Sequence, residues 1–118
     1  MYLQGQYITG CIPFKDGAVP VHRRPYLVVY VDREQEELHI LTISSVVRKE
    51  HKLKFPTNIL LNYSMPPLIQ PSFVKIDSCQ RIAFQFADRE CKLMSDGALM
   101  QTDDLNAVID AYKKYIEK

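Results

Sequence analysis

The sequence predicts a mainly β fold, a small curled barrel or sheet with one helix packed on it. Short apolar, β-branched and aromatic segments fill the first two thirds of the 118 residues, separated by polar residues or by Pro and Gly. One amphipathic segment follows near the C-terminus. Each strand or helix of this kind has an apolar face to bury, so they are expected to share one core. We therefore expect a single domain over residues 1–118.

Two neighbouring segments predict the centre of the sheet. Tyr26–Val31 is a nearly unbroken apolar run, which is typical of a buried central strand. Leu38–Ser45 predicts the next strand and carries more hydrogen-bonding side chains. The stretch between them, residues 32–37, is too polar for a core and predicts a hairpin connection.

Weaker patterns predict the rest of the sheet. Tyr7–Ile12 predicts a first strand and residues 57–62 a short one. Ser72–Asp77 alternates apolar and polar residues, as a half-buried strand does, and Gln80–Phe86 continues the sheet or turns a corner. Met65–Pro71 contains three prolines, which remove backbone donors, so we expect an extended connector there.

The C-terminal segment predicts an amphipathic helix over about residues 103–117. Thr102 would supply the N-cap, with Asp103 and Asp104 as acidic residues in the first turn. The apolar residues that recur at helical spacing are Leu105, Val108, Ile109, Tyr112 and Ile116. We expect this face to pack on the sheet, although it could instead bind a partner.

Composition limits the compartment and the chemistry. The chain is 47% hydrophobic and 25% charged with a net charge of +1, which is typical of a globular protein and excludes extended disorder. Its three cysteines, Cys11, Cys79 and Cys91, form no C-x-x-C pair, so we expect neither a disulfide framework nor a zinc site. The N-terminal residues lack signal-peptide character, and no segment approaches the roughly 20 apolar residues of a membrane span. We expect a cytoplasmic protein.

Most catalytic signatures are missing from the chain. It has no Gly-rich phosphate loop, no H-E-x-x-H and no G-x-S-x-G. A three-histidine metal site would need His22, His39 and His51, and His39 lies inside a predicted strand, where a packed or edge position is expected. We therefore expect no metal and no other cofactor.

A polar pair at two strand ends remains. Arg24 precedes the strand from Tyr26, and Ser44 lies at the end of the adjacent strand. In an antiparallel hairpin these ends lie side by side, so Arg24 and Ser44 should be neighbours. A guanidinium beside a hydroxyl suits a phosphate-like anion. Two basic clusters flank the pair and could bind phosphates or form a solvated surface: His22-Arg23-Arg24, and Arg48, Lys49, His51, Lys52 and Lys54.

At these residues the sequence resembles the MazF/PemK/Kid family of toxins. That family's pattern has a Gly-acidic-Ile strand, an Arg-Pro before an apolar strand, a strand ending in a small hydroxyl residue, and a Pro-Ser strand before a C-terminal helix. The corresponding segments here are Gly10-Cys11-Ile12, Arg24-Pro25-Tyr26-Leu27-Val28-Val29, Leu41-Thr42-Ile43-Ser44-Ser45, Phe55-Pro56-Thr57 and Pro71-Ser72-Phe73-Val74-Lys75-Ile76-Asp77. The similarity extends over about residues 7–117, and Cys11 stands where relatives carry an acidic residue.

The resemblance implies a dimeric SH3-like barrel that cuts single-stranded RNA and is neutralised by the tail of a cognate antitoxin. The family's key arginine falls on Arg24 and its key hydroxyl residue on Ser44. The ribose 2′-OH would attack the adjacent phosphorus without a metal, and these two side chains would stabilise the developing charge. Supporting or RNA-binding roles would fall on His22, Arg23, Ser45, Arg48, Lys49, Lys52, Ser72 and Ser78. Of these, His22 is a candidate for proton transfer, and Ser78 stands where relatives often carry an RNA-contacting Gln.

A second interpretation keeps the barrel and drops the catalysis. Such a module would bind nucleic acid without cutting it, or would inhibit a protein as CcdB inhibits gyrase. Gyrase-directed relatives use the end of the last helix, and here residues 114–118 are mostly charged, with Tyr115 as a possible exception. The arginine–hydroxyl pair and its basic clusters favour the nuclease.

Overall fold

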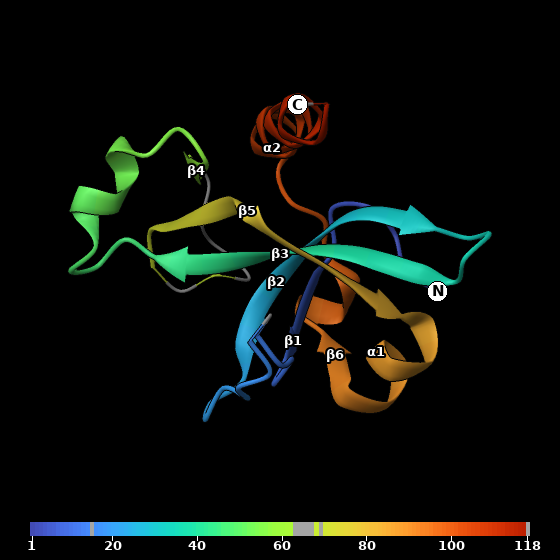
Figure 1. The fold of residues 1–118 in the computed structure, drawn as a ribbon. Helices are drawn as coiled ribbons and strands as arrows, with labels where there is room; N and C mark the ends of the chain where they lie inside the picture. Colours follow the sequence, from blue (N-terminus) through green and yellow to red (C-terminus); the bar gives the residue numbers. More distant parts are fainter. Residues whose placement is uncertain (15, 63–67, 69, 118) are drawn as a thin grey trace.

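Six strands form one antiparallel sheet in the computed structural model, which describes residues 1–14, 16–62, 68 and 70–117. The sheet order is β4-β5-β3-β2-β1-β6. The strands are β1 (Tyr7–Gly10), β2 (Arg24–Asp32), β3 (Glu37–Ser45), β4 (Asn58–Leu60), β5 (Ser72–Ala83) and β6 (Cys91–Leu93). Most of the predicted connector Met65–Pro71 lies outside the described residues. The mainly β, SH3-like fold with a C-terminal helix is confirmed (Figure 1).

The predicted central hairpin is confirmed. β2 and β3 pair from Tyr26↔Thr42 to Asp32↔Glu37, and β5 pairs with the other edge of β3. The two predicted segments 72–77 and 80–86 are largely one strand, β5, which turns a corner through a bulge. Between the pairs Ile40↔Gln80 and Thr42↔Lys75, β5 has more residues than β3. Extra residues on one strand increase its bend and twist, so the sheet curls at this point.

Each face of the sheet carries its own apolar core. One cluster lies under the C-terminal helix and includes Tyr7, Leu27, Val29, Leu41, Ile43, Val74, Ile76, Val108 and Tyr112. The other lies on the opposite face and includes Ile8, Tyr26, Val28, Leu38, Ile40, Ile82 and Ala87. Alternate residues of β2 therefore enter different cores, and this is why its sequence is apolar without a break.

Helix α2 (Thr102–Ile116) packs on the first core, as predicted, but begins differently. The side chain of Gln101 caps it, accepting from the backbone N–H groups of Asp103 at 2.8 Å and Asp104 at 3.2 Å. The predicted N-cap, Thr102, is therefore wrong. Asp104 is only 2% exposed, and its Oδ1 accepts from the Asn62 backbone N–H. The last residue of the predicted apolar stripe, Ile116, is 57% exposed.

Several short elements were not predicted. Residues 84–86 belong to helix α1 (Phe84–Glu90) instead of a strand, because a short apolar run fits either element when only its period is known. α1 covers the second core with Ala87 and leads into β6, which pairs with β1. Two 3-10 turns, η1 (Glu50–Lys54) and η2 (Ser95–Gly97), complete the described elements. No helix among the described residues combines the length and apolar character needed to cross a membrane.

In the described part of the chain, the end where β2 begins and β3 ends lies away from α1 and α2 (Figure 1). Figure 1 shows α2 and α1 on opposite sides of the sheet, with η1 projecting beyond the end of β3. The long loop after β1 approaches the start of β2. The start of β2, the end of β3 and two connecting segments therefore lie at the same end of the sheet. Arg24 and Ser44 belong to these strand ends.

Replacing Leu41 by Ala tests the placement of the central hairpin. Leu41 is fully buried on β3, so the Leu41→Ala variant should lose about 2–5 kcal/mol of unfolding free energy through lost contacts and a residual cavity. Urea denaturation followed by circular dichroism measures this. Leu60→Ala is the matched control, because Leu60 is 47% exposed on β4. Equal losses in the two variants would contradict this placement.

Candidate functional site

Arg24 and Ser44 lie together at the edge where β2 begins and β3 ends. Tyr26 pairs with Thr42, so the residues two positions further out, Arg24 and Ser44, face each other on the same side of the sheet. Both side chains line the same two cavities. The predicted neighbourhood of the guanidinium and the hydroxyl is therefore confirmed.

Lys49 adds a third polar side chain beside Arg24 and Ser44. Its Nζ donates a hydrogen bond of 3.0 Å to the Oγ of Ser44. The turn after β3 brings it back over the strand end, since the Lys49 backbone N–H donates to the Val46 carbonyl and Arg48 adopts a left-handed φ of 63°. Because the Ser44 oxygen accepts from Lys49, its own proton stays available for donation to an anion.

Two cavities adjoin at these residues. They have volumes of about 820 Å³ and about 350 Å³, and Phe14, Arg24, Ser44 and Lys49 line both of them. Arg24 is held over the Phe14 ring, with its Cζ 5.6 Å from the ring centroid. The polar side chains of Arg24, Ser44 and Lys49 thus lie at the boundary between the two cavities. An anion bound to them would have space for a substituent in either cavity.

The smaller cavity is strongly cationic. Lys52 and Lys75 join Arg24 and Lys49 in its lining, against the single carboxylate of Asp77. Burial lowers the pKa of Lys49, and the positive charges of Lys52, Arg24 and Lys75 lower it further. Among the described residues the one ion pair within 4 Å is Arg89–Glu90, on α1. Within the described part of the chain these cations have no carboxylate within 4 Å, so an anion would be attracted to them.

The larger cavity combines apolar walls with a few polar groups. Its apolar lining includes Val19, Pro20, Val21, Ile43, Leu68 and Met94. His22 lies at its wall, exposed on the loop that precedes β2. Arg23 also lines it, and its guanidinium donates to the Thr9 carbonyl at 2.6 Å, which holds the loop against β1. Such a cavity suits a flat aromatic group such as a nucleobase.

The predicted serines are placed in the site but already have partners. Ser45 Oγ accepts from the backbone N–H of Val47, and Ser72, which is buried, donates to the Gln70 carbonyl. Both line the larger cavity. Their hydrogen bonds hold the chain at the end of β3 and the start of β5, so both serines shape the cavity wall.

Ser78 and Arg48, both predicted to support RNA binding, lie in different surroundings. Ser78 lines the smaller cavity, but its Oγ accepts from the Thr42 N–H at 2.8 Å and donates to the Lys75 carbonyl at 2.6 Å. It thereby satisfies backbone groups that the β5 bulge leaves without ladder partners. Arg48 is exposed and lines neither cavity, unlike Lys49 and Lys52.

Two contributors were missed in the sequence. Phe14 has no predicted role, and Lys75 is named only within the Pro71–Asp77 motif. Alternation along β5 could have found Lys75, because it lies between the buried residues Val74 and Ile76. Phe14 offers no such signal, since its position depends on the path of the loop.

Solved structures of MazF share this architecture. MazF from Deinococcus radiodurans superposes with a TM-score of 0.64 at 17% sequence identity, over 97% of this chain and 94% of that chain. The MazE-MazF structure from the same organism gives a TM-score of 0.61 at 16% identity, over 95% and 91%. The chain has the MazF fold. No protein-family model and no curated protein sequence matches it. The MazF fold that the sequence pattern implied is thus confirmed by shape, at an identity too low to carry function with it.

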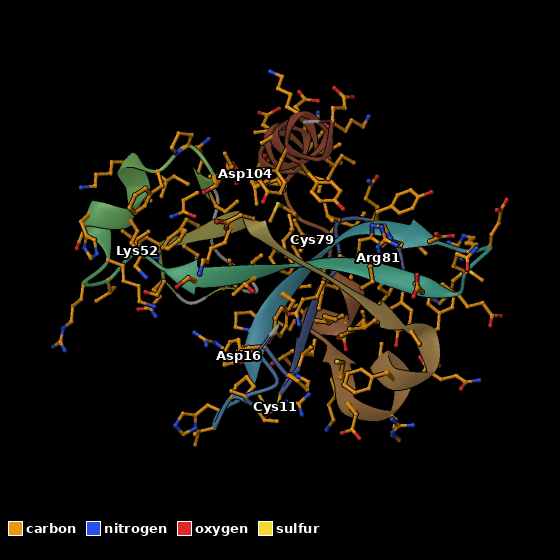
Figure 2. The ribbon with its side chains drawn as sticks, viewed as in Figure 1. Cys11, Asp16, Lys52, Cys79, Arg81 and Asp104 are labelled. Atoms are coloured by element: carbon orange, nitrogen blue, oxygen red, sulfur yellow. The ribbon has the colours of Figure 1, made fainter. Side chains whose placement is uncertain are left out.

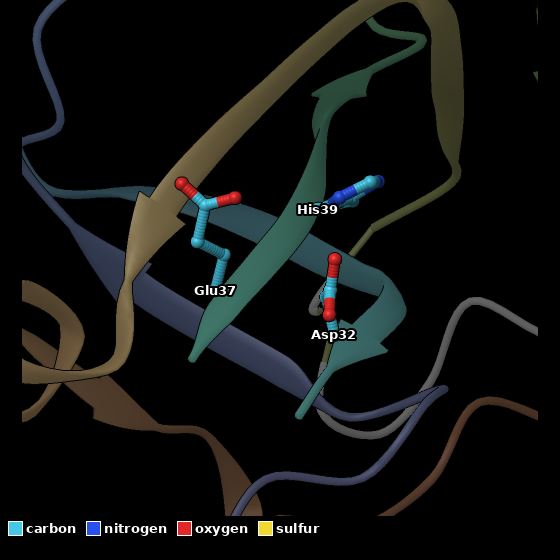
Figure 3. A group of neighbouring side chains, drawn as sticks. All are labelled: Asp32, Glu37 and His39. Carbon is cyan, nitrogen blue, oxygen red and sulfur yellow. The ribbon is translucent and has the colours of Figure 1, made fainter. Parts of the chain in front are cut away.

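A second polar cluster lies far along the β2–β3 hairpin, at its turn. One potential ligand atom from each of Asp32, Glu37 and His39 lies within 4.8 Å of the others (Figure 3). Sequence motifs do not predict this group, because its residues come from two strands, β2 and β3. Arg81 on β5 pairs with His39 on the neighbouring strand β3, and the charge of Arg81 helps to lower the His39 pKa. A protein cation thus already faces the cluster, which disfavours a metal ion there.

His39 also connects the sheet to α2. Its Nδ1 lies 3.3 Å from the hydroxyl of Tyr112, which lies 3.3 Å from the Sγ of Cys79. The His39 ring meets Tyr30 edge to face, with centroids 5.1 Å apart. The sequence predicted a packed or edge position, and His39 is packed.

The stability of the fold should depend on the protonation of His39. Burial, followed by the charge of Arg81, lowers its pKa, while Asp32 and Glu37 act in the opposite direction. The folded-state pKa lies below the unfolded value of about 6.5, so the stabilisation is complete above that pH and is lost as the pH falls through the folded pKa.

The measurement is the unfolding free energy of wild type and His39→Gln between pH 8 and pH 5. The difference in unfolding free energy between wild type and His39→Gln should shrink as the pH falls. A difference that stays constant or grows would show that His39 does not titrate in this way.

Proposed function

We propose that this protein is a toxin-type endoribonuclease that cuts single-stranded RNA without a metal. The observation that carries the proposal is the Arg24–Ser44 pair at the boundary of two cavities, with Lys49 bonded to Ser44. Three donors converge there, and one is a guanidinium that matches the geometry of a phosphate. The MazF fold of the chain agrees with this chemistry.

In the proposed reaction the ribose 2′-OH attacks the adjacent phosphorus. The P–O5′ bond breaks, leaving a 2′,3′-cyclic phosphate on one product and a 5′-OH on the other. Arg24 donates to the non-bridging oxygens, where negative charge grows, and the Ser44 hydroxyl donates a further hydrogen bond. Since the nucleophile belongs to the substrate and the stabilising charges belong to side chains, the reaction can proceed without a metal ion.

The two cavities give the RNA a path across the site. Lys52 and Lys75 would contact phosphates on the side of the smaller cavity, through charge and without sequence preference. On the other side, one base would enter the larger cavity beside Phe14 and His22. Only an unpaired base can be turned into such a cavity, so single-stranded RNA is the expected substrate.

The proposal includes protein partners. The MazE-MazF structure from D. radiodurans contains MazE together with MazF. By analogy, a cognate antitoxin would cover the RNA groove of this chain, and two copies of the chain would form a homodimer. Its RNA substrate would place the protein in the cytoplasm.

One observation favours a second candidate, inhibition of a protein such as gyrase. At the end of α2, Tyr115 is 42% and Ile116 is 57% exposed. An exposed aromatic and aliphatic pair on a terminal helix is a plausible contact for a protein target. A DNA supercoiling assay with purified gyrase decides this: inhibition that Tyr115→Ala abolishes would support the second candidate.

Replacing Arg24 by Ala tests the nuclease. In the presence of a chelator, wild type should cleave single-stranded RNA to cyclic-phosphate ends, and Arg24→Ala should be slower by about 10²-fold or more. Gel analysis with product-end mapping measures both. Arg33→Ala is the control, because Arg33 is exposed on the turn between β2 and β3. If Arg24→Ala cut as fast as wild type, the mechanism would be wrong.

Lys52 should contribute to binding without reading sequence. Lys52→Ala should weaken RNA binding by a similar factor for all sequences and lower the salt dependence by about one counterion. Fluorescence anisotropy at several salt concentrations measures both effects. Lys113→Ala, an exposed change on α2, serves as the control. If Lys52→Ala bound RNA as tightly as wild type in low salt, Lys52 would lie outside the RNA path.

A further inference from the structure

The cations of the site are not equivalent. Lys49 contacts the Ser44 hydroxyl at 3.0 Å, whereas Lys52 and Lys75 line only the smaller cavity. Lys49 also lines both cavities, as Arg24 and Ser44 do. Its Nζ is therefore fixed at the boundary, within reach of any phosphate that Arg24 and Ser44 hold.

The proposed cleavage lacks a proton donor. When the P–O5′ bond breaks, the departing oxygen is an alkoxide that needs a proton. Arg24 is a poor donor, because a guanidinium keeps its protons near neutral pH. The Ser44 hydroxyl can stabilise charge by hydrogen bonding but holds its proton even more firmly than an ammonium group does. Another group must supply the proton.

We propose that Lys49 is the general acid that protonates the 5′-oxygen leaving group. The assignment rests on the proposed ribonuclease activity. The 2′-oxygen forms its bond to phosphorus and loses its proton to water. As the P–O5′ bond breaks, its electron pair passes to the 5′-oxygen, and this oxygen takes a proton from the Lys49 ammonium. The neutral amine left on Lys49 then regains a proton from solvent, so the protein returns to its starting state.

The surroundings of Lys49 favour release of its proton. Lys52 on η1, Arg24 on β2 and Lys75 on β5 face Lys49 with like charge, and Asp77 on β5 contributes a carboxylate to the lining of the smaller cavity. Burial and these charges lower its pKa from the usual value of about 10.4. An ammonium group with a lowered pKa is a stronger acid than that of an exposed lysine, as a general acid requires.

His22 is the competing donor. It lines the larger cavity only, and it is exposed on the loop before β2. Lys49 is instead positioned by two hydrogen bonds, one from its backbone N–H to Val46 and one from its side chain to Ser44. A group held at a defined distance from the phosphate donors is the better placed of the two.

The experiment uses Lys49→Arg, which keeps the charge but cannot release a proton near neutral pH. Two RNA oligonucleotides are compared, one with the normal linkage and one with sulfur replacing the bridging 5′-oxygen at the cleaved position. A thiolate leaves without protonation. On the normal linkage Lys49→Arg should bind as wild type does and cleave about 10²-fold more slowly or worse. On the sulfur linkage it should cleave at nearly the wild-type rate.

Lys113→Arg, an exposed change on α2 outside both cavities, is the control and should keep the wild-type rate on both linkages. The kcat/KM of wild type should also fall at high pH relative to that of Lys49→Arg, because only the lysine loses its proton there. This fall should begin below the pH at which an ordinary lysine titrates.

Other results would overturn the assignment. Unchanged cleavage of the normal linkage by Lys49→Arg would show that no proton comes from Lys49. An equal loss on both linkages would make Lys49 a positioning residue for Ser44. Sulfur rescue of His22→Gln but not of Lys49→Arg would make His22 the acid. Wild type that cuts neither linkage would instead refute the ribonuclease proposal itself, and the acid assignment with it.

Discussion

The candidate site depends on the antiparallel register of β2 and β3. Pairing from Tyr26↔Thr42 fixes which residues face each other at the open end of the hairpin, and they are Arg24 and Ser44. A slip of one residue would turn one of the two side chains to the opposite face. Because alternate residues of β2 enter two different apolar cores, such a slip would also expose buried side chains on both faces. The energy that holds the fold together is thus the energy that positions the pair.

The segments after the strands add what the hairpin alone does not provide. The turn after β3 returns Lys49 to Ser44, and the loop before β2 brings Phe14 to Arg24. On the other side, the β5 bulge curls the sheet and is closed by Ser78. The result is a cationic boundary between an apolar cavity and a basic one. Figure 2 labels Lys52, a residue of the basic cavity, at the η1 end of the molecule.

Prediction from the sequence succeeded where a pattern has one solution. The unbroken apolar run of β2 and the adjacent strand pattern of β3 predict one antiparallel hairpin. That hairpin places Arg24 beside Ser44. Prediction failed where the outcome depends on tertiary contacts. Residues 84–86 fit a strand or a helix equally well, and Gln101 became the cap of α2 because its side chain could reach two free N–H groups. The Lys49 contact depends on a left-handed residue in a turn, which sequence period does not report.

The most direct test of the central claim is a double-mutant cycle on RNA cleavage with Arg24→Ala, Ser44→Ala and the double variant. Two groups that act on one phosphate should be coupled, so the double variant should lose clearly less than the product of the two single losses. Losses that simply multiply, or a wild type that leaves single-stranded RNA intact, would contradict a shared phosphate site at this strand edge.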